Sequence, residues 1–168
     1  DSLGQSLEYN KKASKFLEAL DDFNTLAYVQ SNLGNIYKDQ GQYDQALVHH
    51  TKASEYAERL GDVEAMAHAN LSIGESHFRL TNLGLSKKFA LRGLEIAEKS
   101  NFPIQSKNAH NLLFKIAEAQ ADYETALNEK ILYTNINDSL NAAEAQERLA
   151  EVETKYETEK KEAEIARL

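Results

Sequence analysis

The sequence of 168 residues contains no cysteine, no tryptophan and a single proline. The lack of cysteine excludes disulfides, thiolate catalysis and cysteine metal sites, and it fits the cytoplasm and the bacterial periplasm alike. Because only one proline and seven glycines are present, the abundant Ala, Leu, Glu, Lys and Gln predict a nearly all-α domain. No apolar run approaches the roughly 18 residues of a membrane span, so we expect no membrane contact by this segment.

The chain is also short of positive charge, with 19 Lys and Arg against 27 Asp and Glu and a formal charge of −8. This balance argues against nucleic acid or an anionic membrane as the main partner. The first residues, LGQSLEYNKKASKFLEAL, already have a helical pattern with no partner helix before them. We therefore expect the sequence to be a segment of a longer protein.

The sequence repeats itself with a period of 40 residues and without insertions. Residues 3–22 align with 43–62 and 83–102, and the segments that precede these copies align in the same register. Each unit reads as two helices joined by a tight turn. Because such units cannot bury their apolar faces alone, we expect them to stack into a solenoid.

Small residues stand at equivalent positions of the units. Gly34 aligns with Gly74, and Ala46 aligns with Ser86. A glycine inside a helix costs roughly 1 kcal/mol relative to alanine, and we expect close packing of the paired helices to offset that cost. Phe114 takes the glycine position of the third unit, which predicts a wider or rearranged crossing there.

The unit NLGNIY…GQYDQAL…KASEYAE, within residues 32–58, resembles the tetratricopeptide repeat (TPR) family. It has that family's Leu-Gly-x-x-Tyr in the first helix and its small residues in the second. The resemblance covers about residues 3–140 and implies an all-α, right-handed superhelix (an α-α solenoid) that binds a protein or peptide. A 40-residue unit, longer than the commonest length of about 34, resembles the subgroup found in bacterial signalling proteins.

These patterns predict a solenoid over residues 1–140 and a C-terminal helix over 141–168. The expected helices of the solenoid are a lone second helix at 3–20 and helix pairs at 24–60, 63–100 and 104–140. Pro103 is expected in the first turn of a helix, after Ser100 or Asn101 as the cap.

Residues 141–168 break the repeat, because the columns of Leu33 and Gly34 would continue onto Glu153 and Thr154. The segment is rich in charged i,i+4 pairs such as Glu144–Arg148, which favour a helix. Two interpretations stay open. In one, the first turns of this solvated helix cap the last repeat through Ala142, Ala145 and Leu149.

In the other interpretation, the second half of the segment pairs with a second copy as a coiled coil and makes a homodimer. Its apolar seam at heptad spacing is thin and consists of Leu149, Val152, Tyr156, Ala163 and Ala166.

The run LAEVETKYETEKKEAEIARL (149–168) looks like the connector of bacterial TPR sensor proteins. In those proteins it joins the repeats to a membrane helix and a histidine kinase, a DNA-binding regulator or a diguanylate cyclase. The resemblance implies a sensory, protein-interaction role in signal transduction, with a histidine kinase as the first choice of output domain, and favours the periplasm over the cytoplasm. A stand-alone peptide-binding scaffold is the alternative.

No chemistry-bearing motif stands out in these 168 residues. His49 and His50 are adjacent, so on a helix they point about 100° apart and cannot form the i,i+4 pair of a zinc site. His68, His77 and His110 have no paired ligand at a recognised spacing. We interpret all five as packing residues, and we predict no catalytic residue, no metal and no cofactor for this segment.

A binding groove is the functional prediction, because the first helix of each TPR pair lines the concave face. Asn35 is the first choice, since an amide can both donate to and accept from an extended peptide backbone. For each residue, an ordinary solvated side chain is the alternative. The candidates outside the core columns are Tyr28, Ser31, Asn32, Asn35, Lys38, Asp39, His68, Ser72, Glu75, Arg79, Asn108, Asn111 and Lys115.

The family also has members that grip a peptide carboxylate with several lysines, arginines and asparagines. That set is incomplete here, because Leu71 and Glu75 stand where cationic or amide groups would help. A chaperone-tail adaptor is therefore disfavoured.

Overall fold

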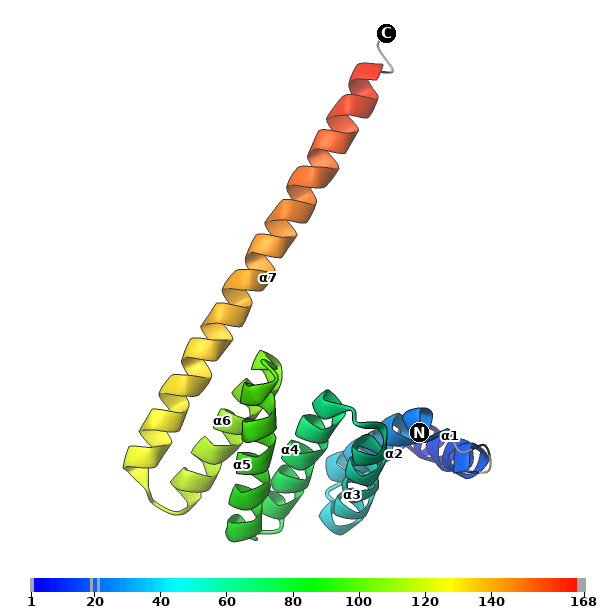
Figure 1. Ribbon diagram of the computed structural model, residues 1–168, viewed down its shortest axis with the longest axis vertical. Helices are drawn as coiled ribbons and strands as arrows, with labels where there is room; N and C mark the ends of the chain where they lie inside the picture. The colour runs from blue at the N-terminus through cyan, green and yellow to red at the C-terminus, as the bar shows by residue number, and fades with distance from the viewer. Residues whose placement is uncertain (1, 19, 21, 166–168) are drawn as a thin grey trace. The chain divides into compact units, whose positions relative to one another are not determined.

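The computed structural model describes residues 2–18, 20 and 22–165, and the regular structure in this part of the chain is α-helical (Figure 1). The chain divides into two units, Asp1–Tyr133 and Thr134–Leu168. The expectation of an all-α solenoid is confirmed. The described helices are α1 (Ser2–Glu18), α2 (Phe23–Asp39), α3 (Tyr43–Leu60), α4 (Val63–Arg79), α5 (Leu83–Lys99), α6 (Pro103–Ala119) and α7 (Tyr123–Ile165).

Within the first unit, the helices pack in antiparallel pairs that stack on one another (Figure 1). α2 packs against α3 and α4 against α5, and α4 also contacts both α2 and α6. The first helices of successive pairs therefore lie side by side. Leu112, Leu113 and Ile116 of α6 form a buried cluster with Ala90 of α5, which shows how one pair covers the apolar face of the next.

The turns between helices share one geometry, repeated every 20 residues. In each turn, a backbone amide just after the helix donates a hydrogen bond to the carbonyl five residues earlier, in the last turn of that helix. The Gln42 amide, for example, donates to the Tyr37 carbonyl at 2.9 Å. This is the Schellman arrangement, which needs a residue with positive φ. Those residues are Gly41, Gly61, Thr81, Asn101 and Ala121, with φ between 56° and 73°.

Pro103 lies in the first turn of α6, as expected from the sequence. The N-cap of that helix, however, is Phe102, so the expected caps Ser100 and Asn101 were wrong. Asn101 instead takes the left-handed conformation that terminates α5, and Ser100 is the C-cap of that helix.

The aligned glycines of α2 and α4, Gly34 and Gly74, make room for different neighbours. A Cβ on Gly74 would lie 3.2 Å from the Ser86 carbonyl oxygen and 3.3 Å from the Ala90 amide nitrogen, so here the backbones of paired helices do approach closely. At Gly34 the space is filled by a side chain, because a Cβ there would lie 2.4 Å from the ring of His50. The simple helix-crossing explanation thus applies to Gly74 and needs correction at Gly34.

In the third unit, Phe114 replaces the glycine and Lys130 stands at the position of His50. The Lys130 ammonium lies 5.0 Å from the centre of the Phe114 ring, within the range of a cation–π contact. The third unit therefore places an aromatic ring and a lysine at the positions that glycine and histidine occupy in the first unit.

A column of polar contacts joins the paired helices. Gln30 is buried, donates to Ser14 at 2.8 Å and meets His49 Nδ1 at 2.7 Å. Two units later, His110 and Glu129 stand at the same two positions, 2.7 Å apart. Four of the histidines thus have packing or polar contacts inside the solenoid, including His50, which is fully buried, and His77, which stacks on Phe89.

The helix α7 continues through residue 140 without a break. The division into a solenoid at 1–140 and a terminal segment at 141–168 stays a prediction, as does the proposed cap formed by Ala142 and Ala145. Arg148 bonds to Glu144 as expected for an i,i+4 pair. The heptad seam from Leu149 to Ala166 lies outside the residues whose side chains are described.

Candidate peptide-binding groove

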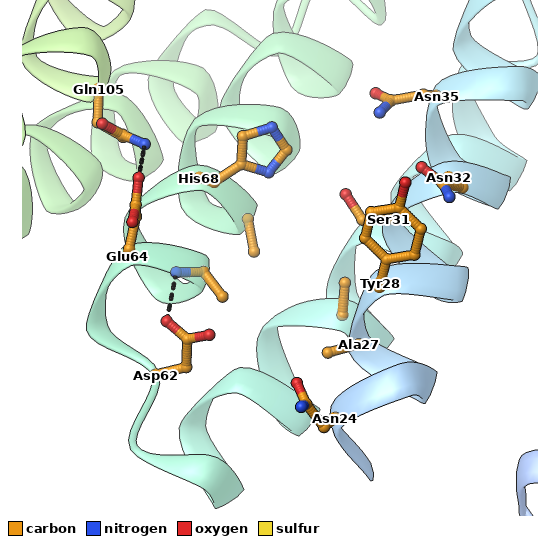
Figure 2. A pocket seen from close by; sticks show the side chains of 13 residues that line it. Asn24, Ala27, Tyr28, Ser31, Asn32, Asn35, Asp62, Glu64, His68 and Gln105 are labelled. Atoms are coloured by element: carbon orange, nitrogen blue, oxygen red, sulfur yellow. Dashed lines mark hydrogen bonds between the residues drawn. The ribbon is translucent and has the colours of Figure 1, made fainter. Parts of the chain in front are cut away.

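A groove of ≈ 460 Å³ lies between α2 and α4 in the first unit. Its size falls in the usual range for ligand sites. Figure 2 shows Tyr28 and the asparagines of α2 on one wall, and Asp62, Glu64 and His68 on the other. The lining residues are Asn24, Ala27, Tyr28, Ser31, Asn32, Asn35, Ala53, Asp62, Glu64, Ala65, His68, Ala69 and Gln105.

The α2 wall is one face of an amphipathic helix. Asn24, Tyr28 and Asn35 recur at spacings of four and seven residues, which place them on one side. Leu26 and Leu33 occupy the opposite side and are buried. Burial of the apolar side thus holds the polar side toward the groove.

The α4 wall begins at a capped helix end. Asp62 accepts a hydrogen bond from the Ala65 amide at 3.0 Å, which satisfies one of the unpaired amides of the first turn. Glu64 accepts from the Gln105 side chain at 2.9 Å, so α6 contributes to the same wall (Figure 2). These bonds fix two carboxylates at the rim of the groove.

His68 stands on the α4 wall and faces α2 (Figure 2). Loss of surrounding water lowers the pKa of its imidazole below the usual 6.5, the charge of Lys38 lowers it further, and Glu64 opposes both effects. The side chain is still exposed at the surface of the groove. Because its pKa is lowered, the ring is neutral at pH 7. A neutral imidazole offers a ligand one donor and one acceptor.

An ion cluster bridges α2 and α4 one turn beyond the groove. Glu75 lies 3.3 Å from the Lys38 ammonium and 3.9 Å from the Arg79 guanidinium. Lys38 and Arg79 thus share the carboxylate of Glu75, so basic side chains stand at this end. The other end, at Asp62 and Glu64, is negative.

The structure brings together five of the thirteen predicted site residues, namely Tyr28, Ser31, Asn32, Asn35 and His68. Of the others, Ser72 is buried at 8% exposure, and Asp39 is exposed at the end of α2. The residues predicted on α6 do not line the groove; they are Asn108, Asn111 and Lys115.

Sequence reasoning missed Asn24, Asp62, Glu64 and Gln105. The spacing could have identified Asn24, since it lies one turn before Tyr28 on the same face. Asp62 falls between the predicted helix pairs 24–60 and 63–100, outside the helical faces from which the candidates were chosen. The contact of Gln105 with Glu64 joins residues 41 positions apart, and it depends on how successive pairs stack.

Two negative findings concern the described residues only. None of the helices there is both long and apolar enough to cross a bilayer. No three histidine, cysteine or acidic side chains in that part of the chain lie together as a metal-binding group.

Comparisons with known proteins agree with this architecture. The crystal structure of BtubC (BKLC) from P. vanneervenii matches with a TM-score of 0.73 at 17% sequence identity over 83% of this chain, which is a likeness of fold alone. This chain spans 58% of the length of that protein. No curated protein matches the sequence. Residues 25–99 match the family model described as tetratricopeptide repeat, which confirms, for this part of the chain, the resemblance drawn from the motifs within residues 32–58.

Proposed function

We propose that this chain is the sensory, protein-interaction segment of a bacterial signal-transduction protein. TPR domains bind proteins or peptides, and the groove between α2 and α4 is the observation that supports such binding here. A peptide in this groove would shift the packing of the two pairs. The helix α7 would pass that shift to an output domain, with a histidine kinase as our first choice and a diguanylate cyclase or DNA-binding regulator as others.

The groove is suited to an extended main chain because its walls carry amides and a hydroxyl. Asn32 and Asn35 each supply two donors and an acceptor, and Ser31 supplies one donor. Spaced along α2, these groups can pair with successive peptide units of a bound strand. This support also holds for the alternative, a self-contained peptide-binding scaffold, because both functions use the same groove.

Peptide binding itself is tested by selecting random displayed peptides on the full chain and measuring their affinity for the Asn35→Ala variant. We expect a loss of about fivefold to tenfold, because each lost hydrogen bond is worth about 1 kcal/mol. Asn128→Ala is the matched control, since Asn128 is exposed on α7 and does not line the groove. Equal affinity of all three proteins would contradict the assignment of the groove.

The relay is tested by light scattering on the full chain and on a chain that lacks residues 149–168. A sensor predicts self-association that depends on these residues and responds to the selected peptide. A scaffold predicts a monomer in both cases, with unchanged peptide affinity.

A further inference from the structure

We propose that the groove between α2 and α4 selects peptides that carry an arginine or lysine, and that it holds this side chain beside Asp62 and Glu64. The inference rests on the proposed function, to which it adds the chemistry of the partner. It also predicts where along the groove the basic residue of the peptide lies, at the N-terminal end of α4.

The charge of the groove favours a cation. Among the described residues that line it, the formally charged ones are Asp62 and Glu64, and none is lysine or arginine. His68 adds no positive charge at pH 7, since its pKa is lowered by burial. The N-terminus of α4 contributes only about half a positive charge, which is too small to cancel two carboxylates.

Both carboxylates are held in place before a ligand arrives. One oxygen of Asp62 accepts from the Ala65 amide at 3.0 Å, and one oxygen of Glu64 accepts from Gln105 at 2.9 Å. A carboxylate can accept at both oxygens. Each therefore retains capacity for a donor from a guanidinium or ammonium group without giving up its present bond.

The opposite wall supplies an aromatic surface. Tyr28 is 69% exposed, although it is a large side chain on a folded helix, and it faces the α4 wall (Figure 2). A basic side chain that reaches the carboxylates can lay its alkyl stem or its charged group against such a ring. The groove thus pairs an aromatic contact with negative charge.

The far end of the groove is less suited to a basic side chain. There, Lys38 and Arg79 already occupy the carboxylate of Glu75, so a basic residue of the peptide would have to compete with them for it. A basic residue of the peptide is thereby directed to the Asp62 end, and an acidic residue, where the peptide has one, to the Lys38 end.

The test compares isosteric charge removal at two matched sites. The variant Asp62→Asn/Glu64→Gln keeps an N-cap acceptor and an acceptor for Gln105 but removes both charges. The control Asp122→Asn/Glu124→Gln changes the same Asp-x-Glu pattern at the start of α7, where Asp122 caps through the Thr125 amide. The probes are peptides selected on the full chain, each with a copy in which Gln replaces its basic residue.

We expect selection to enrich arginine or lysine, and the groove variant to lose at least about fivefold affinity at low salt. The loss should shrink at high salt, vanish for the Gln-substituted peptides and be absent in the control variant. If the peptides bind Asn35→Ala more weakly but bind Asp62→Asn/Glu64→Gln with unchanged affinity, this inference is overturned and the proposed function stands. Recovery of no groove-dependent peptide would overturn both.

Discussion

At the residue scale, the contact between Gly34 and His50 explains why a glycine stands inside α2. His50 is fully buried, and a methyl group at position 34 would overlap three atoms of its ring. In the next unit, Gly74 and Ala90 stand at the two equivalent positions, and the backbones of the two helices approach closely there. In the first unit, the ring of His50 therefore limits position 34 to glycine.

We predict that Gly34→Ala destabilises the protein by about 2 kcal/mol, since an overpacked core side chain cannot move away. In a His50→Ala background, the same change should be neutral or stabilising by up to about 1 kcal/mol, because alanine favours the helix. Urea unfolding of the four proteins in a double-mutant cycle measures this coupling. Gly84→Ala is the control, as nothing lies within 4 Å of a Cβ there, and additive effects at Gly34 and His50 would show that the contact is absent.

The same histidine makes stability depend on pH. Burial lowers the pKa of His50 to about 3, with smaller effects from Lys38, His68 and His49. Between pH 6.5 and 3 the unfolded chain binds a proton that the folded chain does not, so the free energy of unfolding falls as the pH falls.

From pH 7 to pH 5 we predict a loss of about 2 kcal/mol from His50 alone. The measurement is urea unfolding at both values, for the wild type and His50→Ala. The variant should have the flatter pH dependence, although it is less stable at pH 7. An identical dependence in the two proteins would rule out His50 as the source.

At the scale of the element, the helices and turns were largely predictable from the sequence. The period of 40 residues and the helical spacing of apolar positions predicted paired helices, because each helix of a pair must bury its apolar face. The left-handed turn residues Thr81 and Ala121 were not predictable, because neither has the conformational freedom of glycine. Packing of the flanking helices imposes φ values of 60° and 57° on them.

We therefore predict that Ala121→Gly stabilises the protein by about 0.5–1 kcal/mol. Left-handed backbone costs alanine roughly 1–2 kcal/mol, and the greater freedom of glycine in the unfolded chain offsets part of that gain. Thermal unfolding checks the change, with Ala119→Gly in the last turn of α6 as the control that should destabilise. A loss of stability in Ala121→Gly would contradict the Schellman geometry at this turn.

At the scale of the whole molecule, the candidate groove was only half predictable. Helical spacing on α2 identified Tyr28, Ser31 and Asn35 because these residues share one face of a single element. The opposite wall depends on the stacking of α4 and α6 against α2 and α3, which sequence spacing does not determine. Glu64 and Gln105 meet only through that stacking.

The groove is the central claim, and hydrogen exchange of the full chain with and without a selected peptide tests it most directly. We predict that binding slows amide exchange in residues 24–35 and 62–69, which form the two walls. The outer helices α3 and α5 should change less, except near Ala53, the α3 residue that lines the groove. Protection confined to α3, α5 or α7, with α2 and α4 unchanged, would contradict the claim.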